Sequence, residues 1–212
     1  GLQMAIGADT ALNTIVEAVD RIKMSAQAVT RCFVVETMGR RCGYLALMSG
    51  LAGGAEKVYL NEEGVTLDQL HADVAWLRGA FARGRKLVLA MRNEVANEHY
   101  TTDFIAGLFE EEGHGAFDVR TAVIGHQQQG GSPTPFDRLL ATRLVSRALG
   151  VLAGELAAGT SEGHFLGLVE SSVAVQPMAV MMGQMDLAVR RPKNQWWLAL
   201  RDVVGAVSVE PR

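Results

Sequence analysis

The chain is poor in cysteine and carries no excess of positive charge. Its 212 residues include two cysteines, Cys32 and Cys42, too few for a disulfide-rich scaffold. We expect Cys32 in a strand and Cys42 in the following turn, with no disulfide between them. Reduced thiols favour a reducing compartment, so the cytoplasm is the expected location. A net charge of −3 argues against a nucleic-acid partner, because nucleic-acid-binding domains are usually strongly basic.

Long hydrophobic runs are also missing from the sequence. Residues 164–186 come closest to a membrane-spanning stretch, but Glu170 and Pro177 interrupt them. The N-terminus lacks the charged region and apolar stretch of a secretory signal. We therefore expect neither secretion nor a membrane partner.

Common nucleotide and metal motifs are absent as well. Neither G-x-x-x-x-G-K-[ST] nor G-x-G-x-x-G after a strand occurs. Four histidines at positions 71, 99, 114 and 164 are scattered, without the spacing of metal ligands, so we assign no metal site. The chain is expected to begin with a helix rather than with a strand and a phosphate loop. That order is typical of the later part of a larger protein.

The sequence does contain a regular alternation of apolar segments. Apolar spacing predicts helices over residues 10–24 and 42–52, a third from Thr66 to Gly84, and a short one ending near Gly113. Strands are predicted over residues 32–36, 57–60, 87–91 and 119–124. Because strands alternate with helices, we predict an α/β fold, a Rossmann-like layered lobe with a largely parallel sheet.

A long helix is predicted after this alternating part. Thr134 is a suitable N-cap, and Pro135 is a favoured first helical residue. Its predicted apolar stripe is Phe136, Leu139, Leu140, Leu144, Ala148 and Leu152. We expect a surface loop over residues 154–163, strands over 165–170 and 173–175, and a short helix around 195–200.

Polar side chains gather along three segments that contain predicted strands and the residues after them: 31–44, 86–94 and 120–133. Ligands of open α/β sheets bind beyond the carboxyl ends of the strands. Glycine lets backbone N–H groups approach an anion, and a helix N-terminus adds partial positive charge. Arginine matches phosphate oxygens, glutamate accepts from sugar hydroxyls, and histidine and glutamine can bind either group. These segments together predict a sugar-phosphate site.

Simpler interpretations of the first segment stay open. Gly39 could form only a tight turn, and Arg40 and Arg41 could be a solvated helix start. Positive charge at a helix N-terminus is unfavourable by roughly 0.3–1 kcal/mol, so we infer a compensating anion there.

The other two segments also have simpler interpretations. His126 could be a buried, hydrogen-bonded histidine, and residues 130–133 could be only a loop. Glu94 could pair with Arg92 or Lys86 instead of a sugar hydroxyl. The prediction of a ligand depends on all three segments acting together.

Two stretches carry a family resemblance: VVETMGRRCGY at residues 34–44 and VIGHQQQGGSPTPFDR at residues 123–138. Both resemble the fructose-phosphate segments of the ATP-dependent 6-phosphofructokinases. The resemblance extends from residues 6–14 to residues 195–197. It implies the phosphofructokinase fold, incomplete at the N-terminus, with residues 1–212 as a single α/β region. Intact members transfer the γ-phosphoryl group of Mg-ATP to fructose 6-phosphate in glycolysis, and the resemblance implies a homo-oligomer, a tetramer when intact.

Eukaryotic-type members have a catalytic half and a regulatory half, and this chain is more similar to the regulatory one. Residues 93–104, the three glutamines after His126 and residues 190–197 carry that similarity. The resemblance implies that fructose 2,6-bisphosphate binds as an allosteric activator. The positions that match its site are Arg31, Met38, Gly39, Arg40, Glu94, Arg120, His126, Gln127, Gln128, Gln129 and Arg190. Of these, Arg31 and Arg120 would reach across an interface to the sugar of a neighbouring half.

Two positions depart from the regulatory pattern. Arg40 resembles the catalytic half, whereas Gln129 stands where the catalytic half has arginine. A catalytic fructose 6-phosphate site completed by another chain, and a structural half without ligand, therefore remain alternatives. The nucleotide loop and general-base aspartate of the catalytic half do not occur in the sequence. The resemblance implies Mg-ATP for the intact enzyme, with no cofactor and no turnover by this chain alone, and the catalytic half and further subunits as partners.

Overall fold

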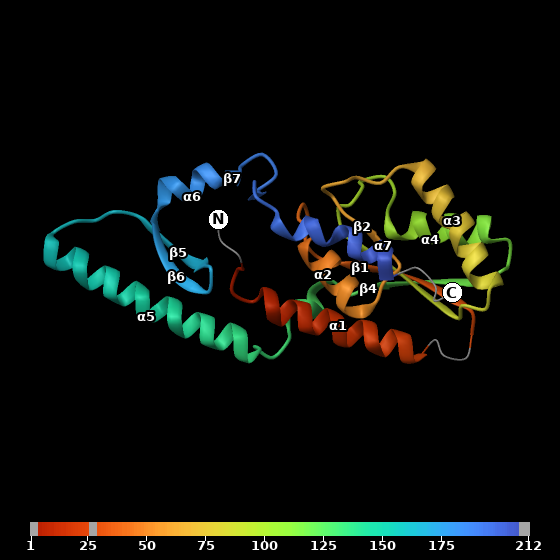
Figure 1. Cartoon of the computed structure of the whole chain (residues 1–212), viewed down its shortest axis with the longest axis horizontal. Coiled ribbons are helices and arrows are strands. Elements are labelled where there is room, and N and C mark those ends of the chain that lie inside the picture. Colours follow the sequence, from red (N-terminus) through yellow and green to blue (C-terminus); the bar gives the residue numbers. More distant parts are fainter. Residues whose placement is uncertain (1–3, 26–28, 208–212) are drawn as a thin grey trace. The chain divides into compact units, whose positions relative to one another are not determined.

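The computed structural model describes residues 4–25 and 29–207. Two compact units make up the chain. Unit 1 comprises residues 1–10 and 131–196, and unit 2 comprises residues 11–130 and 197–212. Each unit has its own elements, which Figure 1 labels.

Unit 2 contains a parallel four-stranded sheet in the order β2-β3-β1-β4. The strands are β1 (Arg31–Thr37), β2 (Lys57–Tyr59), β3 (Leu87–Asn93) and β4 (Asp118–Val123). Thr37 of β1 pairs with Asn93 of β3, and Glu36 pairs with Val123 of β4. The carboxyl ends of these three strands therefore lie side by side, as the predicted α/β fold requires.

The helices of unit 2 pack on its sheet through two hydrophobic clusters (Figure 1). One cluster joins the sheet to α1 (Ala8–Ser25) and α2 (Tyr44–Gly53), and includes Trp197 of the 3₁₀ helix η2 (Trp196–Leu200) and Val204 of α7 (Arg201–Val207). The other joins it to α3 (Leu67–Ala82) and α4 (Thr102–Gly113). The central strands are buried on both faces, which explains their continuous apolar sequence.

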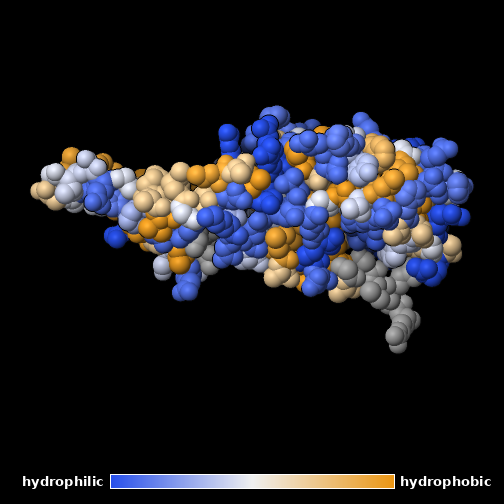
Figure 2. Space-filling view, turned by 90° about the horizontal axis from the view of Figure 1, so that it is seen from above, coloured by the Kyte–Doolittle hydropathy of each residue, from blue (hydrophilic) through white to orange (hydrophobic). Residues whose placement is uncertain are grey.

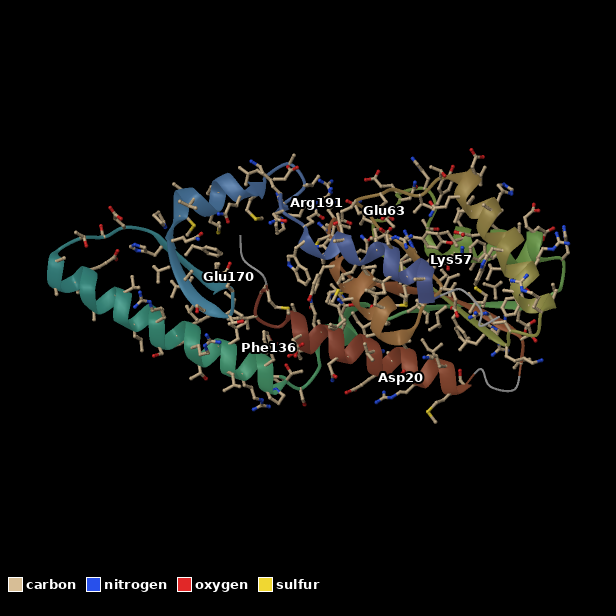
Figure 3. All side chains as sticks on the ribbon, viewed as in Figure 1. Asp20, Lys57, Glu63, Phe136, Glu170 and Arg191 are labelled. Carbon is tan, nitrogen blue, oxygen red and sulfur yellow. The ribbon has the colours of Figure 1, made fainter. Side chains whose placement is uncertain are left out.

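Predicted helix boundaries in unit 2 agree with the observed caps. The Thr66 side chain accepts a hydrogen bond from the Gln69 backbone N–H at 3.2 Å, and α3 begins there. Gly54 ends α2 in the left-handed region, with φ of 69°. Side-chain contacts also tie α3 to β2, because Lys57 (Figure 3) forms an ion pair with Asp73 at 2.6 Å.

Unit 1 contains α5 (Pro135–Ala158), the hairpin β5 (His164–Val169) and β6 (Ser172–Pro177), α6 (Met178–Gln184), and the short strands β7 (Met185–Asp186) and β8 (Arg191–Pro192). Thr134 caps α5 by accepting from the Asp137 backbone N–H at 3.3 Å, as predicted. Figure 3 labels Phe136 in the first turn of α5 and Glu170 in the hairpin turn.

One prediction about this part of the chain was wrong. The loop expected over residues 154–163 is helical as far as Ala158, because good helix formers follow Gly154 and left-handed Gly159 ends the helix. The predicted apolar stripe of α5 is largely exposed. Leu140 is buried, but Leu139 and Leu152 are 65% and 52% exposed.

Sequence periodicity did not predict α6, which is too short for a helical repeat to show. Its hydrophobic side chains Met178, Val180 and Met182 are 41%, 43% and 44% exposed. Figure 2 shows a hydrophobic surface over this helix. Within the described residues, no helix has the length and hydrophobicity needed to span a membrane.

The two cysteines behave as predicted: within the described chain they form no disulfide with each other. Cys32 is fully buried in β1, and burial raises the pKa of its thiol far above the usual value. This thiol is therefore protonated and unreactive at neutral pH.

Candidate functional site at the carboxyl ends of three strands

The loop after β1 has a conformation that demands glycine. Gly39 has φ of 146°, and a Cβ there would lie 2.6 Å from the Cys42 carbonyl oxygen. The Cys42 backbone N–H donates to the Gly39 carbonyl at 2.6 Å, and Arg40 has φ of 21°. Gly39 does form a tight turn, and that turn presents the exposed side chain of Arg40.

Side chains from the end of β3 hold this loop. Glu94 Oε1 accepts from the backbone N–H groups of Arg40 at 2.8 Å and Gly39 at 3.4 Å. The Asn93 side-chain amide donates to the Arg40 carbonyl at 2.9 Å and accepts from the Asn61 backbone N–H at 2.8 Å. Glu94 therefore forms neither of the ion pairs considered from sequence, those with Arg92 and Lys86.

The segment after β4 holds the same loop from the other side. It forms the 3₁₀ helix η1 (Gly125–Gln129), an element that was not predicted from the sequence. Gln128 is 3% exposed, and its side-chain oxygen accepts from the Met38 backbone N–H at 3.0 Å. Its neighbours His126, Gln127 and Gln129 are exposed. The interpretation of His126 as a buried histidine is therefore wrong.

Two kinds of group remain available to a ligand at these strand ends. The Arg40 guanidinium has no ion-pair partner within the described residues, and Glu94 Oε2 accepts no hydrogen bond there. By contrast, the N-terminus of α2 already has an anion, because the Gly43 backbone N–H donates to both carboxylate oxygens of Glu62 at 3.1 Å. Arginine and carboxylate can bind a phosphate and a hydroxyl respectively.

A buried arginine at the end of β3 holds the segment that contains Glu94, and from sequence it was considered only as an ion-pair partner of Glu94. Arg92 is 1% exposed and pairs with Glu36 at 2.8 Å, and it donates to the Thr102 hydroxyl at 2.6 Å. Its second terminal nitrogen donates to the carbonyls of Glu94 at 3.4 Å and Asn97 at 3.3 Å. Burial lowers the pKa of Arg92, while the Glu36 carboxylate opposes that shift.

Of the other predicted arginines of unit 2, Arg31 lies at the opposite end of the sheet, and the guanidinium of Arg120 approaches that end at Asp118. Arg31 begins β1, and Arg120 is the third residue of β4. Arg31 lies six residue steps before Thr37 along β1, which corresponds to roughly 20 Å. Arg31 and Arg120 both approach Asp118 Oδ2, at 3.4 Å and 3.8 Å. The structure thus brings Arg31 and Arg120 together and separates both from Arg40.

Arg190, the last of the predicted site residues, belongs to unit 1. It is exposed and has φ of 57°. Unit 1 also has a cavity of ≈ 750 Å³ beside β5 and α6, lined by residues such as Phe165, Met181 and Trp196. No predicted site residue lines this cavity, so its position gives no support to the predicted site.

Comparison with known proteins shows the family of this chain. Residues 1–152 match the family model described as Phosphofructokinase. The chain belongs to the phosphofructokinase family. It is 45% identical over 215 residues to the muscle-type ATP-dependent 6-phosphofructokinases of Oryctolagus cuniculus and Homo sapiens, which covers 96% of this chain. The matched part spans 28% of the length of each relative.

Solved phosphofructokinases have the same fold. The chain superimposes on the phosphofructokinase of Saccharomyces cerevisiae with a TM-score of 0.91 and 30% identity, covering 100% of this chain and 31% of that one. The T-state enzyme of Pichia pastoris matches with a TM-score of 0.83 and 32% identity, covering 98% and 26%. Both matches confirm the predicted phosphofructokinase fold.

The described residues contain no cluster of three or more His, Cys, Asp or Glu side chains that could hold a metal ion. The sequence also lacks a glycine-rich phosphate loop.

Proposed function

We propose that this chain is the sugar-phosphate-binding part of one half of a 6-phosphofructokinase, and that this half is the regulatory one. Fructose 2,6-bisphosphate is the proposed ligand, an allosteric activator. Both units, residues 1–212, would belong to one region of that half. A cytoplasmic location, assembly with a catalytic half and the absence of turnover by this chain alone remain part of the proposal.

One observation carries this proposal: the loop that Glu94 and Gln128 hold at the carboxyl ends of β1, β3 and β4. The loop has a fixed backbone and an exposed, uncompensated Arg40, which suits an incoming phosphate. Glu94 Oε2 and the exposed His126 would bind sugar hydroxyls. Hydrogen bonds to Glu94 and Gln128 hold the loop backbone before ligand arrives, which lowers the cost of binding.

The bisphosphate requires a second cationic site, and the positions of Arg31 and Arg120 suggest where it comes from. Arg31 lies at the amino end of β1, roughly 20 Å along the strand from Thr37, and Arg120 pairs with Phe33, roughly 13 Å from Thr37. Both guanidinium groups meet at Asp118, the first residue of β4, so they would contact the ligand of a neighbouring half. Ligand binding would then stabilise one arrangement of the subunits, which is the requirement for allostery.

The decisive experiment titrates the purified chain with fructose 2,6-bisphosphate and with fructose 6-phosphate by calorimetry. Tighter binding of the bisphosphate supports the regulatory half. Tighter binding of the monophosphate supports the alternative favoured by Arg40, a catalytic half completed by another chain. If neither sugar binds at millimolar concentration, the remaining alternative is a structural half without ligand.

Replacing Arg40 with glycine tests the phosphate contact itself. Glycine accepts the φ of 21° at this position, so the loop should keep its shape. Removing a hydrogen bond to a charged phosphate should lower sugar affinity by roughly one to two orders of magnitude in the same titration. Arg78→Ala, which removes an exposed arginine from α3, is the matched control and should leave the affinity unchanged.

A further inference from the structure

Asp118 lies where a phosphate would have to bind to use Arg31 and Arg120 together. Its Cα pairs with that of Arg31 across β1 and β4, and Arg120 follows two residues later on the same face of β4. Both guanidinium groups approach one oxygen, Asp118 Oδ2, at 3.4 Å and 3.8 Å. The carboxylate therefore already serves as the anion between the two arginines.

The two arginines have contacts that do not depend on Asp118. The Arg31 guanidinium lies 5.9 Å from the centre of the Phe33 ring, and its side chain is 20% exposed. Its Nε is buried and has no hydrogen-bond partner within the described residues. Arg120 donates to the Val119 carbonyl at 2.6 Å. Both guanidinium groups would thus stay near their positions if the carboxylate moved away.

The contacts of Asp118 itself are weak enough to be replaced. Its side chain is 47% exposed and that of Arg120 is 54% exposed, so water screens their interaction. A phosphate carries more charge and more acceptor oxygens than a carboxylate, and it would bind both arginines more strongly. The same phosphate would be repelled by Asp118 if that side chain stayed in place.

We infer that Asp118 is a built-in competitor for the phosphate that Arg31 and Arg120 bind. The carboxylate neutralises the two arginines when no ligand is present and must turn aside when a phosphate arrives. Asp118 would thereby weaken phosphate binding and set its threshold. This inference rests on the proposed function, since it explains how the second cationic site of that function is regulated.

The test is a titration of the wild-type chain and an Asp118→Asn variant with inorganic phosphate. The readout is the NMR signals of the Arg31 and Arg120 side-chain Nε–H groups. Asparagine keeps the size of the side chain but removes its charge, so phosphate should bind about three- to tenfold tighter. Asp20→Asn is the control: Asp20 (Figure 3) is exposed on α1, and the variant has the same change in net charge.

Unchanged or weaker phosphate binding by Asp118→Asn overturns the inference. The inference is also overturned if phosphate changes neither arginine signal in either protein. Adding Arg120→Ala to Asp118→Asn should abolish the gain, because the gain depends on that guanidinium. The proposed function fails separately, if the wild-type chain binds fructose 2,6-bisphosphate no more tightly than fructose 6-phosphate.

Discussion

Asp137 shows how one buried carboxylate can organise a junction within unit 1. It is 3% exposed in the first turn of α5. It accepts from the Gly7 backbone N–H at 2.9 Å, and from the Thr10 backbone N–H and hydroxyl at 2.8 Å and 2.5 Å. Burial alone would raise the pKa of Asp137, but the hydrogen bonds from Thr10 and Gly7 outweigh it and lower the pKa below its usual value. The carboxylate is therefore held in its charged form.

This lowered pKa predicts a loss of stability in acid. A carboxyl group whose pKa is lower in the folded state stabilises the fold above its unfolded pKa, about 3.9. That contribution disappears as pH falls through the lower folded pKa. Urea unfolding between pH 6 and pH 2.5 should show this loss in the wild type and a smaller loss in Asp137→Asn. At pH 6 the variant should be less stable by about 1.5–3 kcal/mol. If the two proteins lose stability equally in acid, the loss cannot be assigned to Asp137.

At the residue scale, the sequence indicated which side chains reach the strand ends but not what each one contacts. Gly39, Arg40 and Glu94 were predicted there from residue type and position. That Glu94 binds the backbone of Gly39 and Arg40 depends on two loops more than 50 residues apart, so no local pattern could reveal it. Gln128 was chosen as a ligand contact, yet its buried amide supports the Met38 backbone.

At the scale of elements, Arg92 connects β3 to the segment that leads into α4. Its ion pair with Glu36 and its hydrogen bonds to Thr102 and Asn97 join β1, β3 and α4. The Thr102 hydroxyl also donates to Glu36, which closes the network. The terminal nitrogens of Arg92 are paired in this network, whereas its buried Nε has no hydrogen-bond partner within the described residues. Groups in one buried network are energetically coupled.

The costs of removing two members of this network should therefore not be additive. Arg92→Met leaves the Glu36 carboxylate without its cation and should destabilise the chain by about 3 kcal/mol, the low end for a buried pair, because Glu36 keeps some exposure. Glu36→Gln combined with Arg92→Met should cost less than the sum of the single changes. A double-mutant cycle from urea unfolding measures this, and additive costs would show that the pair is not coupled.

Elements with a strong repeat were predicted well, and those without one were missed. The strands β1, β3 and β4 and the helices α1 and α3 agree with the sequence prediction to within a few residues. The seven-residue α6 and the five-residue η1 are too short to show a period. The exposure of α5 could not be foreseen, because periodicity shows which side chains share a face but not what covers that face.

At the scale of the whole molecule, the two units differ in how much core they possess. Both hydrophobic clusters of buried residues belong to unit 2. Among the described residues of unit 1, Leu140 and Leu168 are the only buried hydrophobic side chains. Since burial of apolar surface is the main source of stability, unit 1 has the weaker stabilisation.

Native-state hydrogen exchange should show this difference directly. Amides of β5 and β6 should exchange by local unfolding at a lower free energy than amides of β1 and β3, which are paired on both sides within the core of unit 2. Leu140→Ala, at one of the two buried positions of unit 1, should accelerate exchange in unit 1 and leave β1 and β3 unchanged. Leu77→Ala in α3 is the matched change in unit 2 and should lower the protection of β3. Equal protection of the hairpin and of β1 in the wild type would show that unit 1 unfolds only together with unit 2.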